Sequence, residues 1–412
     1  MARTRFNRLA MMVLVALATA AGILVYAHVG DPLPLIIGTA LMTASLMLHV
    51  PAMSGNRVYL GVAAAAAVPV AVGDAGLAAA IYTTSLTAAW LLYLAFQLVD
   101  RTWLNSEYLA EVIAILGFGG TYHLVSTVFG VHGFSFADRF PHEGYVAIIC
   151  VITGGIVYHV LRASTRSLIG LERADFSPRY LWLAGLEDWS AITVLVLSGT
   201  MIGTAYAGLG WKAIIVAAAP YLFTHQALER YNGTKVTYGQ TIQALSQIPE
   251  VAGLSPVGHA VRTGRLAADI GREMGLHPED VEDLEFAGYM HDIGRITLNE
   301  PAILRAGYTE VDIARWGSQI VSEAPHLEEV SKIVGDQYLP YRSPGMEIDP
   351  SVSVSSKIVK VVSAYDQFVH EYHMAPILAL EQLHKGSAYE FDPRVTSSLR
   401  RVLEFRGELD ER

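Results

Sequence analysis

The sequence predicts an all-α protein: a polytopic transmembrane bundle of about eight helices, followed by a cytoplasmic, all-helical domain. The 412 residues are 52% hydrophobic and only 17% charged, whereas about 25% charged residues is usual for soluble domains. Residues 1–228 hold 11 basic and 11 acidic side chains, so the net charge of −10 lies entirely after residue 228. Beyond that point, apolar residues recur at helical spacing. The two halves therefore suit two different solvents.

Eight apolar runs in the first half predict membrane-spanning helices. Such a helix needs roughly 20 mostly apolar residues. Polar or glycine- and proline-containing turns separate the runs, of which the third is the shortest. They cover approximately residues 9–29, 33–53, 57–73, 75–98, 107–130, 144–162, 188–208 and 211–228. We therefore expect a membrane domain over residues 1–228, with the lipid bilayer as its partner.

The basic residues predict how this domain is oriented. If the N-terminus with Arg3, Arg5 and Arg8 is cytoplasmic, the outer loops carry only Arg139 and Lys212. This distribution satisfies the positive-inside rule. An even number of spans then returns the acidic half to the cytoplasm, which predicts a multi-pass protein of the plasma membrane. The N-terminal apolar run does not predict a cleaved signal peptide, because it continues to about residue 29 and further spans follow.

Few ionisable side chains fall within the predicted spans. Glu107, Glu111 and His123 belong to the fifth span, and His159 lies near the cytoplasmic end of the sixth. Such residues can be functional groups at membrane depth. They can also be interfacial carboxylates and neutral histidines that hydrogen-bond neighbouring helices. Transporters usually repeat broken helices between their halves, and we find no such repeat, so a sensor or anchor role fits better than transport.

The second half is expected to consist of a connecting helix over 229–250, a compact domain over 251–406 and a tail over 407–412. One helix is predicted to open with Ser255 as its N-cap and Pro256 at its first position. Another starts after His277 and Pro278, with acidic residues in its first turn. Further helices are expected over about 309–324, 327–339, 353–372, 377–386 and 393–405. The acidic composition and the lack of a basic stripe argue against a nucleic-acid partner.

The stretch GYMHDIGRITL at 288–298 contains adjacent His291 and Asp292, about thirty residues after His259. An imidazole and a carboxylate together can bind one metal ion, the nitrogen giving directional affinity and the carboxylate neutralising charge. Arg295 follows closely and has the fork geometry that grips phosphate. This pattern predicts a metal site with a phosphate-binding arginine beside it.

The stretches GHAVRTGRLAADIGREMGL and LEFAGYMHDIGRITL resemble the HD superfamily of metal-dependent phosphohydrolases, in particular its HD-GYP branch, which hydrolyses cyclic dinucleotides. The resemblance covers about residues 236–406. It implies that His259 is the first metal ligand, that His291 and Asp292 are the signature pair, and that Arg295 replaces a usual lysine. Glu310 matches a further family position. The resemblance also implies a divalent metal cofactor (Mn, Fe, Mg or Zn), a nucleotide or cyclic dinucleotide as ligand, and a homodimer as one possible assembly.

The chain also departs from the family pattern. Trp316 stands where the HD-GYP pattern has a ligand histidine, and Ser363 aligns with the carboxylate that closes the site. The GYP motif is absent, and Gln337, Tyr338 and Leu339 stand in place of two histidines and a glutamate.

A serine hydroxyl is a poor ligand for a divalent metal, because it is not ionised. Asp366, three residues after Ser363 on the same helix, could replace the missing carboxylate, as could Asp336. The minimal prediction is therefore a metal site of His259, His291, Asp292 and Asp366, with Asp292 and Arg295 as catalytic residues. The alternative is a catalytically degenerate signalling module that binds a nucleotide or a partner without turnover.

Overall fold

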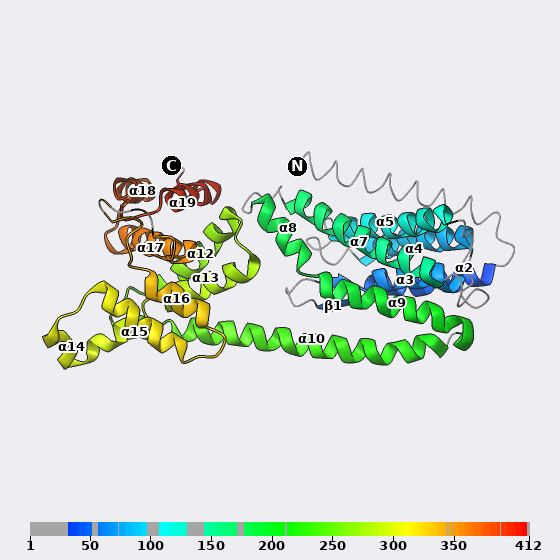
Figure 1. The fold of residues 1–412 in the computed structure, drawn as a ribbon, viewed down its shortest axis with the longest axis horizontal. Helices are drawn as coiled ribbons and strands as arrows, with labels where there is room; N and C mark the ends of the chain where they lie inside the picture. Colours follow the sequence, from blue (N-terminus) through cyan, green and yellow to red (C-terminus); the bar gives the residue numbers. More distant parts are fainter. Residues whose placement is uncertain are drawn as a thin grey trace. The chain divides into compact units, whose positions relative to one another are not determined.

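The computed structural model describes residues 32–51, 57–72, 74–96, 107–129, 144–170, 177–210, 212–343, 345, 347, 349–387 and 389–409. The chain forms two compact units (Figure 1), and we describe each separately. The first unit comprises Met1–Ile169 and Ala184–Gly233, and the second comprises Gly170–Leu183 and Thr234–Arg412. The sequence predicted that Gly170–Leu183 belongs to the membrane domain of residues 1–228. This segment instead groups with the second unit, where the backbone N–H of Ser177 donates to the carbonyl of Arg272 at 3.2 Å.

The first unit is a bundle of apolar helices (Figure 1). Its helices are α2 (Pro32–Met47), α3 (Gly61–Val72), α4 (Ala75–Phe96), α5 (Glu107–Val128), α7 (Gly144–Gly170), α9 (Trp189–Leu209) and the start of α10 (Lys212–Leu245). Helix α8 (Pro178–Leu186) begins in the second unit and ends in the first. Three stretches are long and apolar enough to cross a membrane by length and composition: Leu109–Val128, Val146–Leu168 and Pro178–Tyr206. The predicted run at 9–29 lies outside the described residues, so the count of eight spans stays a prediction.

A short hairpin interrupts two runs that were predicted to be helical throughout. Strands β1 (His49–Pro51) and β2 (Arg57–Tyr59) pair antiparallel, with Val50 opposite Val58. Pro51 explains the break, because proline cannot donate the helical hydrogen bond and disfavours helical backbone in the residue before it. The predicted helices over 33–53 and 57–73 are therefore wrong at these strands, and α2 and α3 are only 16 and 12 residues long.

Helices α3 and α9 pack closely because α9 presents glycines to α3. A Cβ atom on Gly199 would overlap the carbonyl oxygen of Ala63, and one on Gly203 would lie 2.7 Å from the carbonyl oxygen of Ala67. Small residues one turn apart allow two helix backbones to approach within van der Waals contact. Packing here therefore depends on shape rather than on polar contacts.

Charged side chains of the first unit form a buried network. One of the two expectations, that the carboxylates of the fifth span lie at the membrane interface, is therefore wrong for Glu111. Glu111 of α5 is only 1% exposed and accepts a hydrogen bond of 2.6 Å from the Tyr158 hydroxyl. Arg162 of α7 lies 3.5 Å from Glu111 and donates to Asp188 at 2.9 Å. Arg166 also donates to Asp188, at 3.3 Å. Two arginines thus balance two carboxylates inside the bundle.

The second unit is helical throughout its core. Its elements are the end of α10, α11 (Ile248–Val251), α12 (His259–Met274), α13 (Pro278–Met290), the 3₁₀ segment η2 (Ile293–Asn299), α14 (Pro301–Ala306), α15 (Glu310–Ser322), α16 (Glu328–Asp336), α17 (Val354–Asp366), the π turn η3 (Gln367–Glu371), α18 (Pro376–Lys385) and α19 (Pro393–Phe405). Helix α12 packs against α13, α17 and α19. Ile270, Leu284, Ile358 and Leu399 from these four helices are fully buried.

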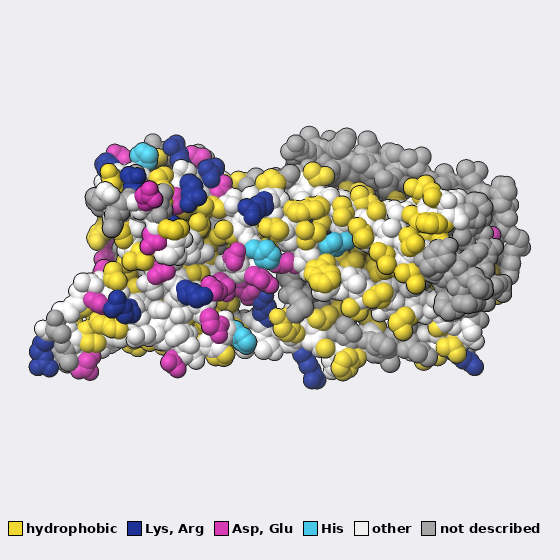
Figure 2. All heavy atoms as spheres, in the orientation of Figure 1, with side chains coloured by type: hydrophobic (Ala, Val, Ile, Leu, Met, Phe, Trp, Pro, Cys, Tyr) yellow, Lys and Arg dark blue, Asp and Glu magenta, His cyan; other side chains and the backbone are white. Residues whose placement is uncertain are grey.

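Surface composition differs between the units, as Figure 2 shows. Hydrophobic side chains cover much of the visible face of the first unit. Large apolar side chains of this unit are more than half exposed, among them Leu124, Ile148, Ile152, Met201 and Phe223. Acidic and basic side chains are spread over the second unit. Large exposed apolar surface is unusual for a soluble protein, so this contrast agrees with a first unit that faces lipid.

Candidate metal centre

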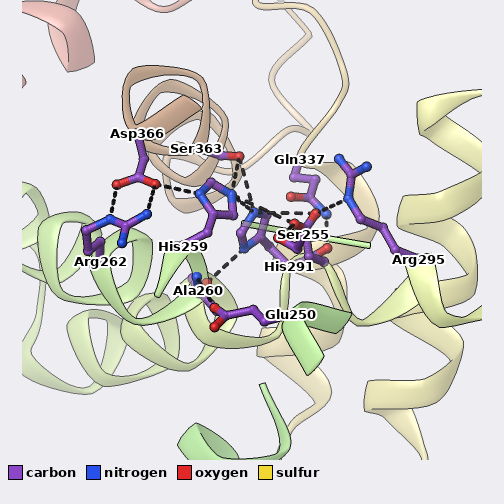
Figure 3. Close-up of polar contacts among 12 residues, drawn as sticks. Glu250, Ser255, His259, Ala260, Arg262, His291, Arg295, Gln337, Ser363 and Asp366 are labelled. Atoms are coloured by element: carbon purple, nitrogen blue, oxygen red, sulfur yellow. Dashed lines mark hydrogen bonds and ion pairs between the residues drawn. The ribbon is translucent and has the colours of Figure 1, made fainter. Parts of the chain in front are cut away.

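Three buried side chains of the second unit, His259, His291 and Asp292, converge on one point, and Figure 3 shows the two histidines facing each other. His259 is the first residue of α12, His291 follows the last residue of α13, and Asp292 precedes η2. The two Nε2 atoms lie 3.1 Å apart. Asp292 oxygens lie 3.8 Å from His259 Nε2 and 3.6 Å from His291 Nε2. Both imidazoles are completely inaccessible and Asp292 is 3% exposed. The structure thus brings together the three residues that the sequence grouped.

Glycines on α12 and α13 bring the two histidines close. A Cβ atom on Gly288 would lie 2.5 Å from the Cα of Gly264, so only glycine fits where the helices cross. Close approach of this kind lets the start of α12 reach the end of α13. His259 and His291, 32 residues apart in the chain, consequently face each other with ring centroids 4.9 Å apart.

Helix α12 begins three residues later than predicted, at His259. Its N-cap is Gly258 with a φ of 78°, a left-handed conformation that glycine adopts readily. The Glu250 carboxylate accepts hydrogen bonds from the backbone N–H groups of Gly258 at 2.7 Å and Ala260 at 3.1 Å. Ser255, the predicted cap, instead donates to Asp292 at 2.7 Å. This prediction was wrong because an acceptor distant in the sequence takes the serine hydroxyl.

Hydrogen bonds determine which ring nitrogen of each histidine carries the proton. His291 Nδ1 lies 2.9 Å from the carbonyl oxygen of Gly288, which can only accept, so Nδ1 donates. His259 Nδ1 lies 2.7 Å from an Asp366 oxygen and donates to it. Neutral imidazole has one donor and one acceptor nitrogen. When both rings are neutral, each Nε2 therefore carries a lone pair, and the two Nε2 atoms lie 3.1 Å apart.

The spacing of the donors fits a metal ion. Metal–nitrogen bonds of about 2.0–2.1 Å place neighbouring ligands about 3.0–3.4 Å apart, and the two Nε2 atoms are 3.1 Å apart. Burial lowers the pKa of His291, which favours its neutral, ligating form. Two facing acceptors and a carboxylate form an unfavourable arrangement unless a cation or a proton lies between them.

Asp292 is ionised at neutral pH. Burial would raise the pKa of the Asp292 carboxyl, but the positive charge of Arg295 beside it lowers that pKa, which favours the carboxylate. The Arg295 Nε atom donates to Asp292 at 2.6 Å. Arg295 Nη2 also donates to the Tyr338 hydroxyl at 3.2 Å and lies 3.7 Å from a Glu310 oxygen. Arg295, expected to bind phosphate, is thus anchored beside the cluster while its side chain stays 18% exposed.

Asp366, which was expected to complete the ligand set, lies on the other side of the His259 ring. It contacts Nδ1 of His259, away from the point where the Nε2 atoms meet. Its oxygens also accept hydrogen bonds of 2.7 and 2.8 Å from Arg262. Among the described residues, neither Asp366 nor Asp336 joins the cluster of donors. Ser363 lies nearer, with its hydroxyl 3.2 Å from His291 Nε2 and 3.4 Å from His259 Nε2.

The contacts of several other residues around the cluster were not predicted from the sequence. Gln337, which replaces a family ligand, is 1% exposed and donates a 2.7 Å hydrogen bond to the carbonyl oxygen of His291. Arg262 is the partner of Asp366. Its position three residues after His259, on the same face of α12, was a signal that could have identified it. Trp316, at another substituted position, is half-buried on α15.

Comparison with known families agrees with this geometry. No curated protein matches the chain. Residues 257–366 match the family model described as HD domain. The matched range begins two residues before His259 and ends at Asp366, so it contains His259, His291, Asp292 and Ser363. An HD domain therefore occupies residues 257–366 of the second unit, and its histidine and aspartate donors coincide with the converging cluster.

Proposed function

We propose that this protein is a membrane-anchored, metal-dependent phosphohydrolase or phosphodiesterase that acts on a nucleotide or cyclic dinucleotide in signalling. One observation carries the proposal. Two imidazole Nε2 atoms, each opposite a hydrogen bond on the far side of its ring, lie 3.1 Å apart beside an ionised carboxylate. Such an arrangement is unfavourable when empty and favourable around a divalent cation.

The donor set narrows the choice of metal. Two imidazole nitrogens and one carboxylate suit Mn²⁺, Fe²⁺ or Zn²⁺ better than Mg²⁺, which prefers oxygen ligands. His259, His291 and Asp292 would hold the ion. When bound, a divalent cation supplies Lewis-acid chemistry, lowering the pKa of a water molecule and polarising a phosphoryl oxygen.

Residues beside the ligands would orient the reaction. Arg295 and Ser255 each donate to Asp292 and hold its carboxylate in position. The guanidinium of Arg295, partly exposed, places a positive charge where phosphate oxygens of a substrate would approach. The Ser363 hydroxyl lies within 3.4 Å of both Nε2 atoms and can donate a hydrogen bond but adds no negative charge.

The first unit would anchor this domain in the plasma membrane, with both ends of the chain cytoplasmic. Support comes from the three helical stretches that are apolar and long enough to span a bilayer. Helix α10 runs without a break from Lys212 to Leu245, so the last predicted span and most of the predicted connecting helix form one continuous helix. A continuous helix can transmit a rotation or shift along its length, as a signalling protein requires.

The test uses the full-length chain in lipid nanodiscs. Elemental analysis should find about one Mn, Fe or Zn per chain, and the loaded protein should hydrolyse bis(p-nitrophenyl) phosphate or cyclic di-GMP. The variant His291→Ala should lose both metal and activity. Lack of stoichiometric metal in the wild-type chain would refute the proposal.

Ser363 favours a second candidate function. Because this position supplies a neutral hydroxyl where the wider family has a carboxylate, the site has less negative charge to hold and activate a cation. A domain that binds a nucleotide and transmits a signal without turnover would then result. Metal and nucleotide binding without release of product, in the experiment above, would support this alternative.

A further inference from the structure

We infer that Asp366 and Arg262 form a clamp that fixes His259 in its metal-binding tautomer, and that this clamp sets the affinity of the centre for its cation. The inference rests on the proposed function and assigns Asp366 a positioning role in place of the predicted ligand role. Neither residue touches the point where the Nε2 atoms meet.

Hydrogen bonds engage both carboxylate oxygens of Asp366. One oxygen accepts from His259 Nδ1 at 2.7 Å and from Arg262 Nη2 at 2.8 Å. The other accepts from Arg262 Nε at 2.7 Å and lies 3.0 Å from His370 Nδ1. A carboxylate offers about four acceptor positions. Both oxygens of Asp366 are therefore engaged by hydrogen bonds, which hold the carboxylate beside the Nδ1 side of the His259 ring.

Arg262 holds this carboxylate in one orientation. Its planar guanidinium binds both oxygens of Asp366 at once, a geometry that lysine cannot reproduce. A third nitrogen, Nη1, donates to the carbonyl oxygen of Val257 at 3.0 Å. The clamp thus connects the residues before α12, the start of α12 and the end of α17. Rotation of the His259 ring would break its hydrogen bond to Asp366.

The two imidazoles depend on different kinds of partner. His291 donates to a backbone carbonyl, which no substitution removes. His259 donates to a side chain 107 residues away, so its tautomer can be changed by mutation. Carboxylates that accept from a ligating histidine typically raise metal affinity 10–100-fold. We therefore expect the affinity of the centre to depend on Asp366 and, through it, on Arg262.

Titration of the full-length chain in nanodiscs with Mn²⁺ alone, followed by isothermal calorimetry, tests the inference. Asp366→Ala should weaken Mn²⁺ binding by about 10–100-fold. Arg262→Lys, which keeps the charge but loses the fork, should weaken it by less than Asp366→Ala does. The matched control is Arg272→Lys on the same helix, whose partner is Asp269 at 2.7 Å and which should leave affinity unchanged.

A double-mutant cycle separates positioning from a general effect on folding. In a His259→Ala background, Asp366→Ala should cause no further loss of Mn²⁺ affinity, because there is no ring left to position. An equal further loss would overturn the inference. So would a single Asp366→Ala variant that binds Mn²⁺ within about threefold of the wild type. A wild-type chain that binds no Mn²⁺ would instead overturn the proposed function, and this inference with it.

Discussion

Each unit of this protein buries a cluster of polar side chains, and the two clusters differ in which groups face each other. In the first unit, Arg162 lies between Glu111 and Asp188, so opposite charges meet. In the second unit, His259 and His291 turn acceptor nitrogens toward each other. In the first cluster Arg162 supplies the counter-charge, whereas the second sets two acceptor nitrogens beside a carboxylate, an arrangement that a cation would stabilise. Burial and charge alone therefore do not distinguish the two clusters, but the kinds of group that face each other do.

Removal of Arg162 should produce the largest effect, because it takes the counter-charge out of the cluster in the first unit. Arg162→Ala leaves Asp188 and Glu111 buried without their main counter-charge, which typically costs about 3–5 kcal/mol. Thermal unfolding of the full-length chain in nanodiscs should show a clearly lower midpoint. Arg166→Ala serves as control and should cost less, since the Arg166 side chain is 21% exposed and that of Arg162 is 5%. Equal midpoints for the wild type and Arg162→Ala would contradict a structural role for this network.

Loss of His291 should weaken metal binding by the cluster of His259, His291 and Asp292. His291→Ala removes one of two nitrogen ligands, so Mn²⁺ binding should weaken by at least about 100-fold, or about 2.7 kcal/mol, more than loss of an outer partner. Calorimetry with Mn²⁺ measures this change. His326→Ala, at an exposed position of the same unit, should bind Mn²⁺ as the wild type does. Retention of full affinity by His291→Ala would show that the metal, if any, binds elsewhere.

The contact between α3 and α9 is stabilised by close packing and not by polar groups, unlike the two clusters. Gly199→Leu forces the two backbones apart, because even a Cβ atom would overlap the carbonyl oxygen of Ala63. Overpacking of this kind costs roughly 1–3 kcal/mol, so the unfolding midpoint in nanodiscs should fall. Gly208→Leu lies on the same helix, where an added Cβ would meet nothing within 4 Å, and it should be nearly neutral. If both variants unfold alike, close helix packing is not what stabilises this region.

Asp283 should give the smallest effect, and one that depends on pH. Burial, with help from Glu282 and Asp280, raises the pKa of Asp283 to about 6. Because the folded-state pKa lies above the unfolded value, the ionised carboxylate destabilises the fold above pH 6, and this cost disappears as the pH falls toward 4. Asp283→Asn should therefore stabilise the second unit at pH 7.5 by about 1 kcal/mol, allowing for solvent screening. At pH 4 the variant and the wild type should unfold alike, and a gain that persists there would contradict this explanation.

Much of the site was predictable because it depends on residue type and spacing. The His–Asp pair stood at the end of a predicted helix, and His259 preceded it by about thirty residues on another. Helical periodicity also indicated the helices that carry these residues. The roles of Asp366 and Ser255 were not predictable in this way. Asp366 was expected at the metal because it shares a helix face with Ser363, yet packing turned it toward Nδ1 of His259.

The amino-acid sequence by itself determined the helical class, the division into an apolar half and an acidic half, and the three donors of the centre. These properties depend on local composition and on periodicity along single helices. Only the tertiary structure decided which nitrogen of each histidine is free to bind, why Arg262 matters, and that Glu111 and Arg162 form a buried pair. The physical reason is distance along the chain. A side chain on one helix meets its partner only when helices far apart in the sequence pack, and no local pattern records that meeting.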